Sequence, residues 1–166
     1  MIIKGFAYCL GDDINTDLVI SGRYKFSISD IKELSRHILE DYDPNFYSKL
    51  KKGESILVGG KNFGMGSSRE QAPLVIKEAG IVCVVAKSFA RIFYRNAINI
   101  GLPLVEVDTS LIGDLDELEI DQEKGILKNI TKNYDKKIVP LPEVMQKLLS
   151  DGGLVAHFMK YKTIKL

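Results

Sequence analysis

The chain has 166 residues, a formal net charge of +1 and two cysteines, and this size predicts a single domain with its own hydrophobic core. The near balance of charge gives no basic stripe for nucleic acid, and apolar runs such as Ile81–Ala86 are far shorter than the roughly 20 residues that span a bilayer. Cys9 and Cys83 are too few to hold an iron–sulfur cluster or a structural zinc ion alone, so no metal site is expected in this chain.

The first part of the chain predicts a strand, a polar turn and a helix. Ile2–Leu10 alternates loosely between apolar and polar residues, as a strand does. Gly11–Thr16 favours a turn, and it comes too early for a secretory signal peptide. We therefore expect a cytoplasmic protein, which also suits thiols in apolar stretches. Asp30 caps a helix with Glu33 three residues on, and helical spacing of apolar residues extends that helix to Leu39.

The middle of the chain alternates strands with helices. This order is typical of parallel strands joined by covering helices. The predicted elements are a strand over Ser55–Val58 that leads into Gly59-Gly60, a helix over Arg69–Ala79 closed by Gly80, a strand over Ile81–Ala86, a helix over Phe89–Ile100 capped by Ser88, and a strand over Leu104–Val107.

The last part of the chain changes character. Glu117–Asp121 and Ile126–Ile130 flank a turn that contains Gly125, which predicts a hairpin. Lys137–Val139 predicts one more strand, and Pro142 opens a short helix that is followed by an amphipathic segment.

The segment 59–70, GGKNFGMGSSRE, is the strongest candidate for a functional site. Its glycines allow a backbone to approach a ligand closely. It ends where a helix begins, so free N–H groups and the helix dipole favour an anion there. The same residues also fit a plain capped helix, through Ser67 with Glu70 or Ser68 with Gln71.

Phosphate-binding patterns fail in this segment, whereas carboxylate binding remains open. Met65 and Gly66 stand where a P-loop needs lysine and then serine or threonine, and Arg69 stands where a dinucleotide loop needs glycine. A guanidinium group such as that of Arg69 binds a carboxylate through two parallel hydrogen bonds. A neighbouring serine is a weak base unless positive groups stabilise its alkoxide. His37 and His157 lie near no serine in the sequence, so they are expected at the surface or in packing.

Two further segments leave their roles open. Residues 88–101 predict a helix with one core-facing side, and its Arg91 and Arg95 stand one turn apart, either solvated or beside an anion. Residues 11–17, GDDINTD, lack the bidentate glutamate of an EF-hand loop. A turn held by local hydrogen bonds is the alternative for these acidic residues.

Taken in order, GDDINTD, GRY, GGKNFGMGSSREQAP and AKSFARIFYRNAINIGLPLV resemble the 3-isopropylmalate dehydratase small-subunit family, the swivel domain of the aconitase superfamily as a separate chain. The resemblance implies an α/β fold of the swivelling β/β/α type, with a mixed, largely parallel sheet or barrel flanked by helices, in one domain over residues 1–166. It implies a hydro-lyase of leucine biosynthesis that interconverts isopropylmalate isomers. It also implies activity only with a large subunit that carries a [4Fe–4S] cluster, in a heterodimer or heterotetramer.

The resemblance also assigns roles to particular residues. The family's serine base corresponds to Ser67, its carboxylate-binding arginine to Arg69, and the acidic residue of its Thr-Asp pair to Asp17. Ser68 lies beside the base, and its backbone N–H is expected to bind substrate. These roles agree with the chemistry, because removing a proton next to a carboxylate needs a positioned base and nearby positive groups.

The residues after GRY bear on substrate choice. Relatives that act on a substrate with an extra carboxylate carry arginine two places beyond this tyrosine, where the present chain has Phe26. A phenyl ring packs against an alkyl group and pairs with no carboxylate, although the neighbouring Lys25 supplies a cation. The alternatives are a homoaconitase, citraconate hydratase or 2,3-dimethylmalate dehydratase small subunit, or a non-catalytic anion-binding or scaffold domain with this fold.

Overall fold

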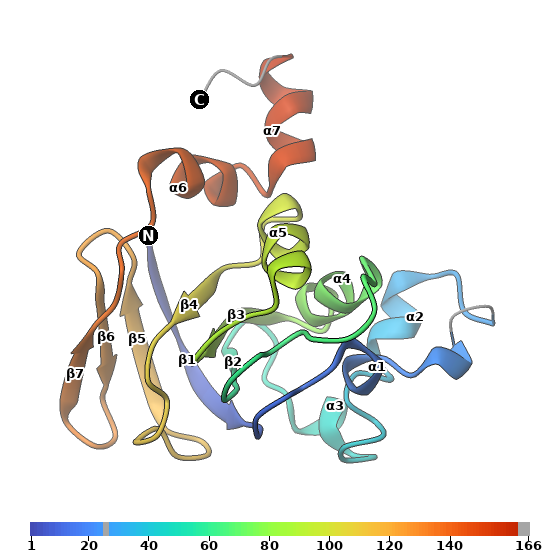
Figure 1. Cartoon of the computed structure of the whole chain (residues 1–166), viewed down its shortest axis with the longest axis horizontal. Coiled ribbons are helices and arrows are strands. Elements are labelled where there is room, and N and C mark those ends of the chain that lie inside the picture. Colours follow the sequence, from blue (N-terminus) through green and yellow to red (C-terminus); the bar gives the residue numbers. More distant parts are fainter. Residues whose placement is uncertain (25–26, 163–166) are drawn as a thin grey trace.

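A single seven-stranded sheet forms the centre of the molecule, with strand order β4-β3-β2-β1-β5-β6-β7. The structure is a computed structural model that describes residues 1–24 and 27–162. Lys25 and Phe26, which were expected to contact the substrate side chain, lie outside the described residues. The sheet curls into a half-barrel with helices beside it (Figure 1), so the predicted α/β class with a mixed sheet flanked by helices is confirmed. The sheet is less parallel than predicted, because within the described residues three of its six strand pairings are antiparallel.

The first four strands are parallel neighbours in chain order: β1 (Ile2–Cys9), β2 (Ser55–Val58), β3 (Ile81–Ala86) and β4 (Leu104–Glu106). Each connection crosses back over the sheet, and the helices of these crossovers gather on the side away from β5–β7 (Figure 1). The crossover elements are α1 (Thr16–Val19), η1 (Gly22–Tyr24), α2 (Ile31–Ser35), α3 (Phe46–Lys49), α4 (Gln71–Glu78) and α5 (Arg91–Asn99).

The last three strands extend the sheet as an antiparallel meander from β1: β5 (Glu117–Asp121), β6 (Ile126–Asn129) and β7 (Tyr134–Lys137). The predicted hairpin is confirmed. The predicted strand over Lys137–Val139 is wrong, because pairing with β6 places the strand three residues earlier, from Tyr134 to Lys137. The sequence of β7 is polar because neither of its faces is fully buried, so no apolar pattern indicated a strand there.

Alternating residues of the parallel strands build two hydrophobic cores, one on each face of the sheet. On the helix side, Leu57 and Val84 pack with α1, α4 and α5 residues such as Phe93. On the other side, Ile56 and Val85 pack with the apolar residues of β5 and β6. The curl of the meander closes this second core without any helix, because the strands themselves cover it.

Three predicted helix ends need correction. The helix that Asp30 caps ends at Ser35 instead of Leu39, and Leu39 has a left-handed backbone (φ 51°) that a helix does not allow. Neither predicted capping box forms at α4, whose N-cap residue is Glu70 and makes no side-chain cap. Ser88 does not cap α5, which begins at Arg91; its hydroxyl accepts the N–H of Asn62 instead.

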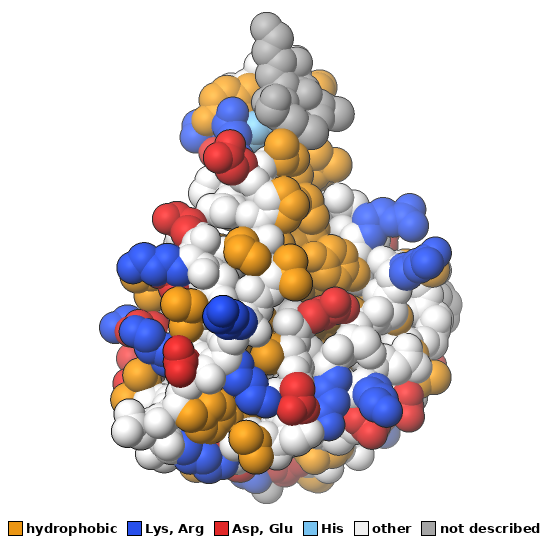
Figure 2. Space-filling view, turned by 60° about the vertical axis from the view of Figure 1, so that its left-hand side comes forward, with side chains coloured by type: hydrophobic (Ala, Val, Ile, Leu, Met, Phe, Trp, Pro, Cys, Tyr) orange, Lys and Arg blue, Asp and Glu red, His pale blue; other side chains and the backbone are white. Residues whose placement is uncertain are grey.

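Two helices, α6 (Glu143–Ser150) and α7 (Leu154–Tyr161), stand at the end of α5 (Figure 1). His157 of α7 is fully buried, and its Nδ1 lies 2.7 Å from Asp151 Oδ2. The other side of α7 exposes Val155, Phe158 and Met159, and hydrophobic side chains run from this end of the chain towards the middle of the face in Figure 2. Within residues 1–24 and 27–162, no helix has the length and apolar content to cross a membrane.

A buried carboxylate fixes the start of the meander. Asp116 Oδ2 accepts hydrogen bonds from the Gly113 N–H (2.7 Å) and the Asn129 amide (2.7 Å), and it lies 3.0 Å from the ammonium of Lys132. Burial by itself raises the pKa of Asp116, but these hydrogen bonds and the Lys132 charge outweigh it and lower the pKa below the ordinary value of 3.8.

Replacement of this carboxylate is therefore expected to destabilise the meander. Asp116→Ala removes the 2.7 Å acceptor of the buried Asn129 amide, which keeps only a 3.4 Å hydrogen bond to the Tyr134 hydroxyl, and it should lower the free energy of unfolding at neutral pH by about 1–3 kcal/mol. Because the pKa is lowered in the folded state, this contribution is complete above the ordinary value of 3.8 and is lost as the pH falls through the folded-state pKa. Urea unfolding at several pH values measures it.

Asp135→Ala is the matched control, because this aspartate is exposed on β7. An equal loss of stability in both variants, or a loss that does not shrink in acid, would contradict the role given to Asp116.

Candidate active site

Three loops meet at the carboxyl ends of the parallel strands. The loop after β2 lies between the loops after β1 and β3, and backbone hydrogen bonds join it to both. On one side the Gly64 N–H donates to Ile14 O (2.7 Å) and the Thr16 N–H donates to Met65 O (2.9 Å). On the other side Phe63 N–H donates to Ser88 O, and Ala90 N–H donates to Phe63 O, both at 2.9 Å. This position, outside the ends of parallel strands, is where ligands bind in open α/β sheets.

The glycines of this loop serve packing against the protein itself. A Cβ atom at Gly60 would overlap the carboxylate of Asp12, and one at Gly64, which also has a positive φ of 82°, would overlap the ring of Phe93. At these two positions, the absence of a Cβ atom is required by the protein's own side chains. The glycines bring the loop close enough to its neighbours to hold the residues that follow.

Ser67 follows this braced loop, and its hydroxyl lies among polar groups from two segments. Arg69 Nε donates to Ser67 Oγ at 3.0 Å, and Ser67 Oγ donates to Asp17 Oδ1 at 3.5 Å. Thr16 Oγ1 lies 3.3 Å from Ser67 Oγ and also donates to the Ser67 carbonyl at 2.9 Å. The serine is exposed, so its oxygen is accessible to a ligand. The same oxygen accepts a hydrogen bond from the cationic side chain of Arg69.

Arg69 is held in place by three contacts. Its Nη2 lies 2.9 Å from Asp17 Oδ1, and its Nη1 donates to the carbonyl of Ile20 at 3.4 Å. Gly22 packs against the guanidinium so closely that a Cβ atom at this position would lie 3.1 Å from Nη2. The side chain of Arg69 is 19% exposed and that of Asp17 is 59% exposed, so the guanidinium is a fixed positive group at the edge of an open site.

The structure brings together Ser67, Arg69 and Asp17, although 50 residues separate Asp17 from Ser67. Ser68 is exposed beside them. The remaining acids of the GDDINTD segment have structural contacts: Asp12 accepts the Lys61 N–H at 2.7 Å, and Asp13 accepts the Asn62 amide at 3.1 Å. These two acids thus bind the next loop.

Sequence reasoning missed three contributors to the site. Thr16 is 2% exposed and contacts both the hydroxyl and the carbonyl of Ser67. The Ile20 carbonyl and Gly22 shape the seat of Arg69. Thr16 and Gly22 lie in the GDDINTD and GRY segments that carry the family resemblance, but nothing in the sequence marks either residue as a contact of Ser67 or Arg69.

Histidine and cysteine side chains lie outside this site. His37 stacks on Tyr24 with 4.0 Å between ring centroids, and His157 is buried under α7. Burial raises the pKa of the Cys9 thiol to about 11 and also raises that of Cys83, which keeps both thiols protonated. Among residues 1–24 and 27–162, no three side chains of the His, Cys, Asp and Glu types gather to hold a metal ion.

Comparison with known proteins gives one consistent result. The model of the aconitase C-terminal domain family matches residues 20–109. The chain is 52% identical to the 3-isopropylmalate dehydratase small subunit 2 of Archaeoglobus fulgidus over the full length of both. It is 55% identical to the 3-isopropylmalate dehydratase small subunit of Caldicellulosiruptor saccharolyticus, over 96% of this chain and 92% of that one.

A solved structure agrees with these sequence relatives. The crystal structure of 3-isopropylmalate dehydratase from Methanocaldococcus jannaschii superimposes with a TM-score of 0.92 at 46% identity, over 98% of this chain and 96% of that one. The half-barrel and the loop that carries Ser67 and Arg69 thus define a domain of the aconitase C-terminal class. Within that class, the chain belongs to the family of 3-isopropylmalate dehydratase small subunits.

The contact between Gly22 and the Arg69 guanidinium can be tested without a substrate. In Gly22→Ala, the new methyl group should displace the guanidinium, because the Cβ position lies only 3.1 Å from Nη2. The Arg69 Nε–H resonance, observed by nitrogen-detected NMR, should then shift and exchange faster with water as its bond to Ser67 lengthens.

Gly11→Ala is the control, since no atom lies within 4 Å of a Cβ placed there. A wild-type Arg69 signal in Gly22→Ala would show that this contact does not seat the arginine.

Proposed function

We propose that the chain supplies the proton-transfer half of the active site in a two-chain 3-isopropylmalate dehydratase, and that the whole chain acts as one swivel domain. The observation that carries this proposal is the hydrogen bond from Arg69 Nε to Ser67 Oγ (3.0 Å), with Asp17 bound to the same guanidinium (2.9 Å). The names of the relatives support isopropylmalate as the substrate.

In this proposal Ser67 is the general base. A serine hydroxyl is a weak base in water, but a cationic N–H donor fixed at its oxygen stabilises the negative charge that an alkoxide carries. In its alkoxide form, Ser67 Oγ takes a proton from the carbon next to a substrate carboxylate, and the electrons of that C–H bond form the double bond as hydroxide leaves. Return of the proton and addition of hydroxide at the exchanged positions gives the isomer.

Arg69 and Asp17 have separate proposed roles. The outer face of the Arg69 guanidinium binds a substrate carboxylate, which aligns the carbon to be deprotonated with Ser67. Asp17 Oδ1 lies 2.9 Å from Arg69 Nη2 and 3.5 Å from Ser67 Oγ, so it is proposed to orient both groups. Ser68 is proposed to bind substrate through its backbone N–H. Phe26, with Lys25 beside it, is proposed to contact the substrate's variable group.

The reaction also needs a partner. The exposed Ser67 and the exposed apolar side of α7 are surfaces that a second subunit can cover. We assign the [4Fe–4S] cluster to that large subunit, where a Lewis-acidic iron would polarise the leaving hydroxyl. A heterodimer or heterotetramer in the cytoplasm, where thiols such as Cys9 and Cys83 stay reduced, completes the proposal.

Two groups of alternatives remain within reach of experiment. A sister hydro-lyase would use the same Ser67 and Arg69 on homoaconitate, citraconate or dimethylmalate. A non-catalytic domain that binds anions would keep Arg69 but make no use of the Ser67 hydroxyl. Co-expression with large subunits and assay against isopropylmalate, homoaconitate and citraconate separates them, because only the correct pair turns over its substrate and the chain alone should turn over none.

Ser67→Ala is the decisive variant in this assay. Loss of the base should lower kcat by about a thousandfold, within the range of general base catalysis, while the two chains still co-purify. Ser48→Ala, at another exposed serine, should keep wild-type turnover. A Ser67→Ala enzyme within a few-fold of wild type would refute the assignment of the base.

Phe26→Arg tests substrate choice. A guanidinium at this position should favour substrates with an additional carboxylate by about tenfold or more in the ratio of kcat/KM values, as expected for one charged hydrogen bond. Lys25→Ala in the same background shows whether the neighbouring cation already contributes. An unchanged ratio in Phe26→Arg would exclude this position as the specificity determinant.

A further inference from the structure

The turn that follows α2 contains a carboxylate on which several side chains converge. Glu40 Oε1 accepts a hydrogen bond from the Tyr24 hydroxyl at 2.9 Å and lies 3.7 Å from Arg23 Nη2. Glu40 Oε2 is bonded to His37 Nδ1, and the His37 ring stacks on Tyr24. Arg23 also pairs with Asp41. The turn therefore binds the side chains of Arg23 and Tyr24, the last two residues of η1.

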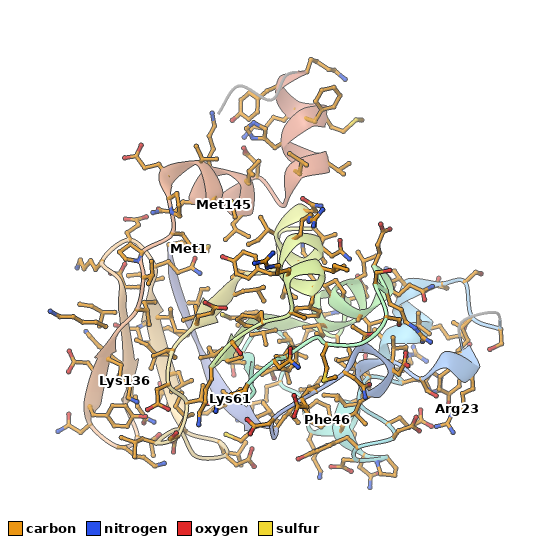
Figure 3. The ribbon with its side chains drawn as sticks, in the orientation of Figure 1. Met1, Arg23, Phe46, Lys61, Lys136 and Met145 are labelled. Carbon is orange, nitrogen blue, oxygen red and sulfur yellow. The ribbon has the colours of Figure 1, made fainter. Side chains whose placement is uncertain are left out.

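Tyr24 also makes backbone hydrogen bonds to residues that follow positions 25 and 26. Its carbonyl accepts the N–H groups of Ser27 (3.2 Å) and Ile28 (3.1 Å), so the chain on both sides of these positions closes on Tyr24. Arg23, at the start of this closure, lies at the edge of the molecule farthest from Lys136 of β7 (Figure 3). The base of the proposed specificity segment is thus bonded to the Tyr24 backbone, while the Tyr24 side chain is bonded to Glu40.

The same turn is also connected to the seat of Arg69. The Leu39 N–H donates to the Val19 carbonyl at 2.9 Å, at the end of α1. Between Val19 and Tyr24 lie Ile20, whose carbonyl accepts from Arg69, and Gly22, which packs against its guanidinium. The turn therefore contacts the chain at Val19 and at Tyr24, on both sides of the short segment that touches Arg69.

We propose that Glu40 is a positioning residue for the dehydratase reaction: by holding Tyr24 it keeps η1 and Gly22 against Arg69, and so sets where the substrate carboxylate binds. This inference rests on the proposed function, since it concerns the substrate that Arg69 would bind. Glu40 touches neither Arg69 nor Ser67, and it acts only through the backbone of η1.

The charge state of Glu40 suits this role. Hydrogen bonds from His37 and then from Tyr24 hold the pKa of Glu40 below its ordinary value, so the carboxylate stays ionised at neutral pH. Its side chain is 29% exposed, and partly exposed ion pairs of this kind contribute little to global stability. A misplacement of about 1 Å at a substrate-binding group, in contrast, is enough to lower rates by about a hundredfold. Loss of Glu40 should therefore affect substrate binding far more than folding.

The test uses the assembled two-chain enzyme with 3-isopropylmalate. Glu40→Gln should raise KM about tenfold, because Arg69 binds the carboxylate already in the ground state, and any fall in kcat should accompany that rise, because the same guanidinium stabilises Ser67 Oγ. Its Tm should stay within about 2 °C of wild type. Tyr24→Phe keeps the ring on His37 and removes only the hydroxyl, so it should reproduce the rise in KM.

A double-mutant cycle and a control make the test specific. If Glu40 acts through the Tyr24 hydroxyl, the double variant should show about the same KM as either single variant. Asp43→Asn is the matched control, because Asp43 lies in the same turn and pairs with Lys49 but has no contact with Tyr24; its KM should equal that of wild type.

The failures of the two proposals are distinguishable. A wild-type pair without turnover overturns the proposed function and this inference together. An active wild-type enzyme with an unchanged KM in Glu40→Gln and Tyr24→Phe overturns only the role of Glu40. A loss of Tm and of kcat with constant KM, or fully additive effects in the double variant, would likewise show a merely structural residue.

Discussion

The guanidinium of Arg69 is the group on which the site depends. It donates to Ser67, pairs with Asp17 and reaches the carbonyl of Ile20, and so it joins the loop after β2 to the short helix after β1. Each of these partners alone is a common surface group. Their convergence on one planar cation with a fixed set of donors gives the serine a defined electrostatic environment.

The parallel half of the sheet makes this convergence rigid. Loops that follow three adjacent strands are hydrogen-bonded to one another beyond the end of the sheet, and the glycines allow side chains such as Phe93 and Asp12 to fill the space between them. The antiparallel meander β5–β7 lies on the opposite side of β1 and closes the second core. One half of the molecule therefore carries the site, and the other half mainly stabilises the sheet.

The buried strands, the crossover order and the Ser67–Arg69 pair were predictable from the sequence, because hydrophobic runs and neighbouring residues are local signals. Asp17 was found only through the family resemblance, since its meeting with Ser67 is a property of the fold. Gly22 lies in the GRY segment that carries the resemblance, but nothing in the sequence indicated its contact with Arg69 or that of the Ile20 carbonyl, because a backbone group acquires its role only from its neighbours. Helix ends failed where tertiary contacts decide, as at Leu39 with its left-handed backbone, and β7 failed because pairing selects it.

The exposure of the Asp17–Arg69 pair has a consequence for assembly. In contact with water, the field of Arg69 at Ser67 is weakened by solvent, because charges interact less strongly at high dielectric constant. Asp17 is 59% exposed in the single chain. A partner surface that removes this water strengthens the same field without moving any atom. Docking of the partner would then strengthen the stabilisation of the Ser67 alkoxide by Arg69 when a substrate is enclosed. In the free subunit, Ser67 would remain a weak base.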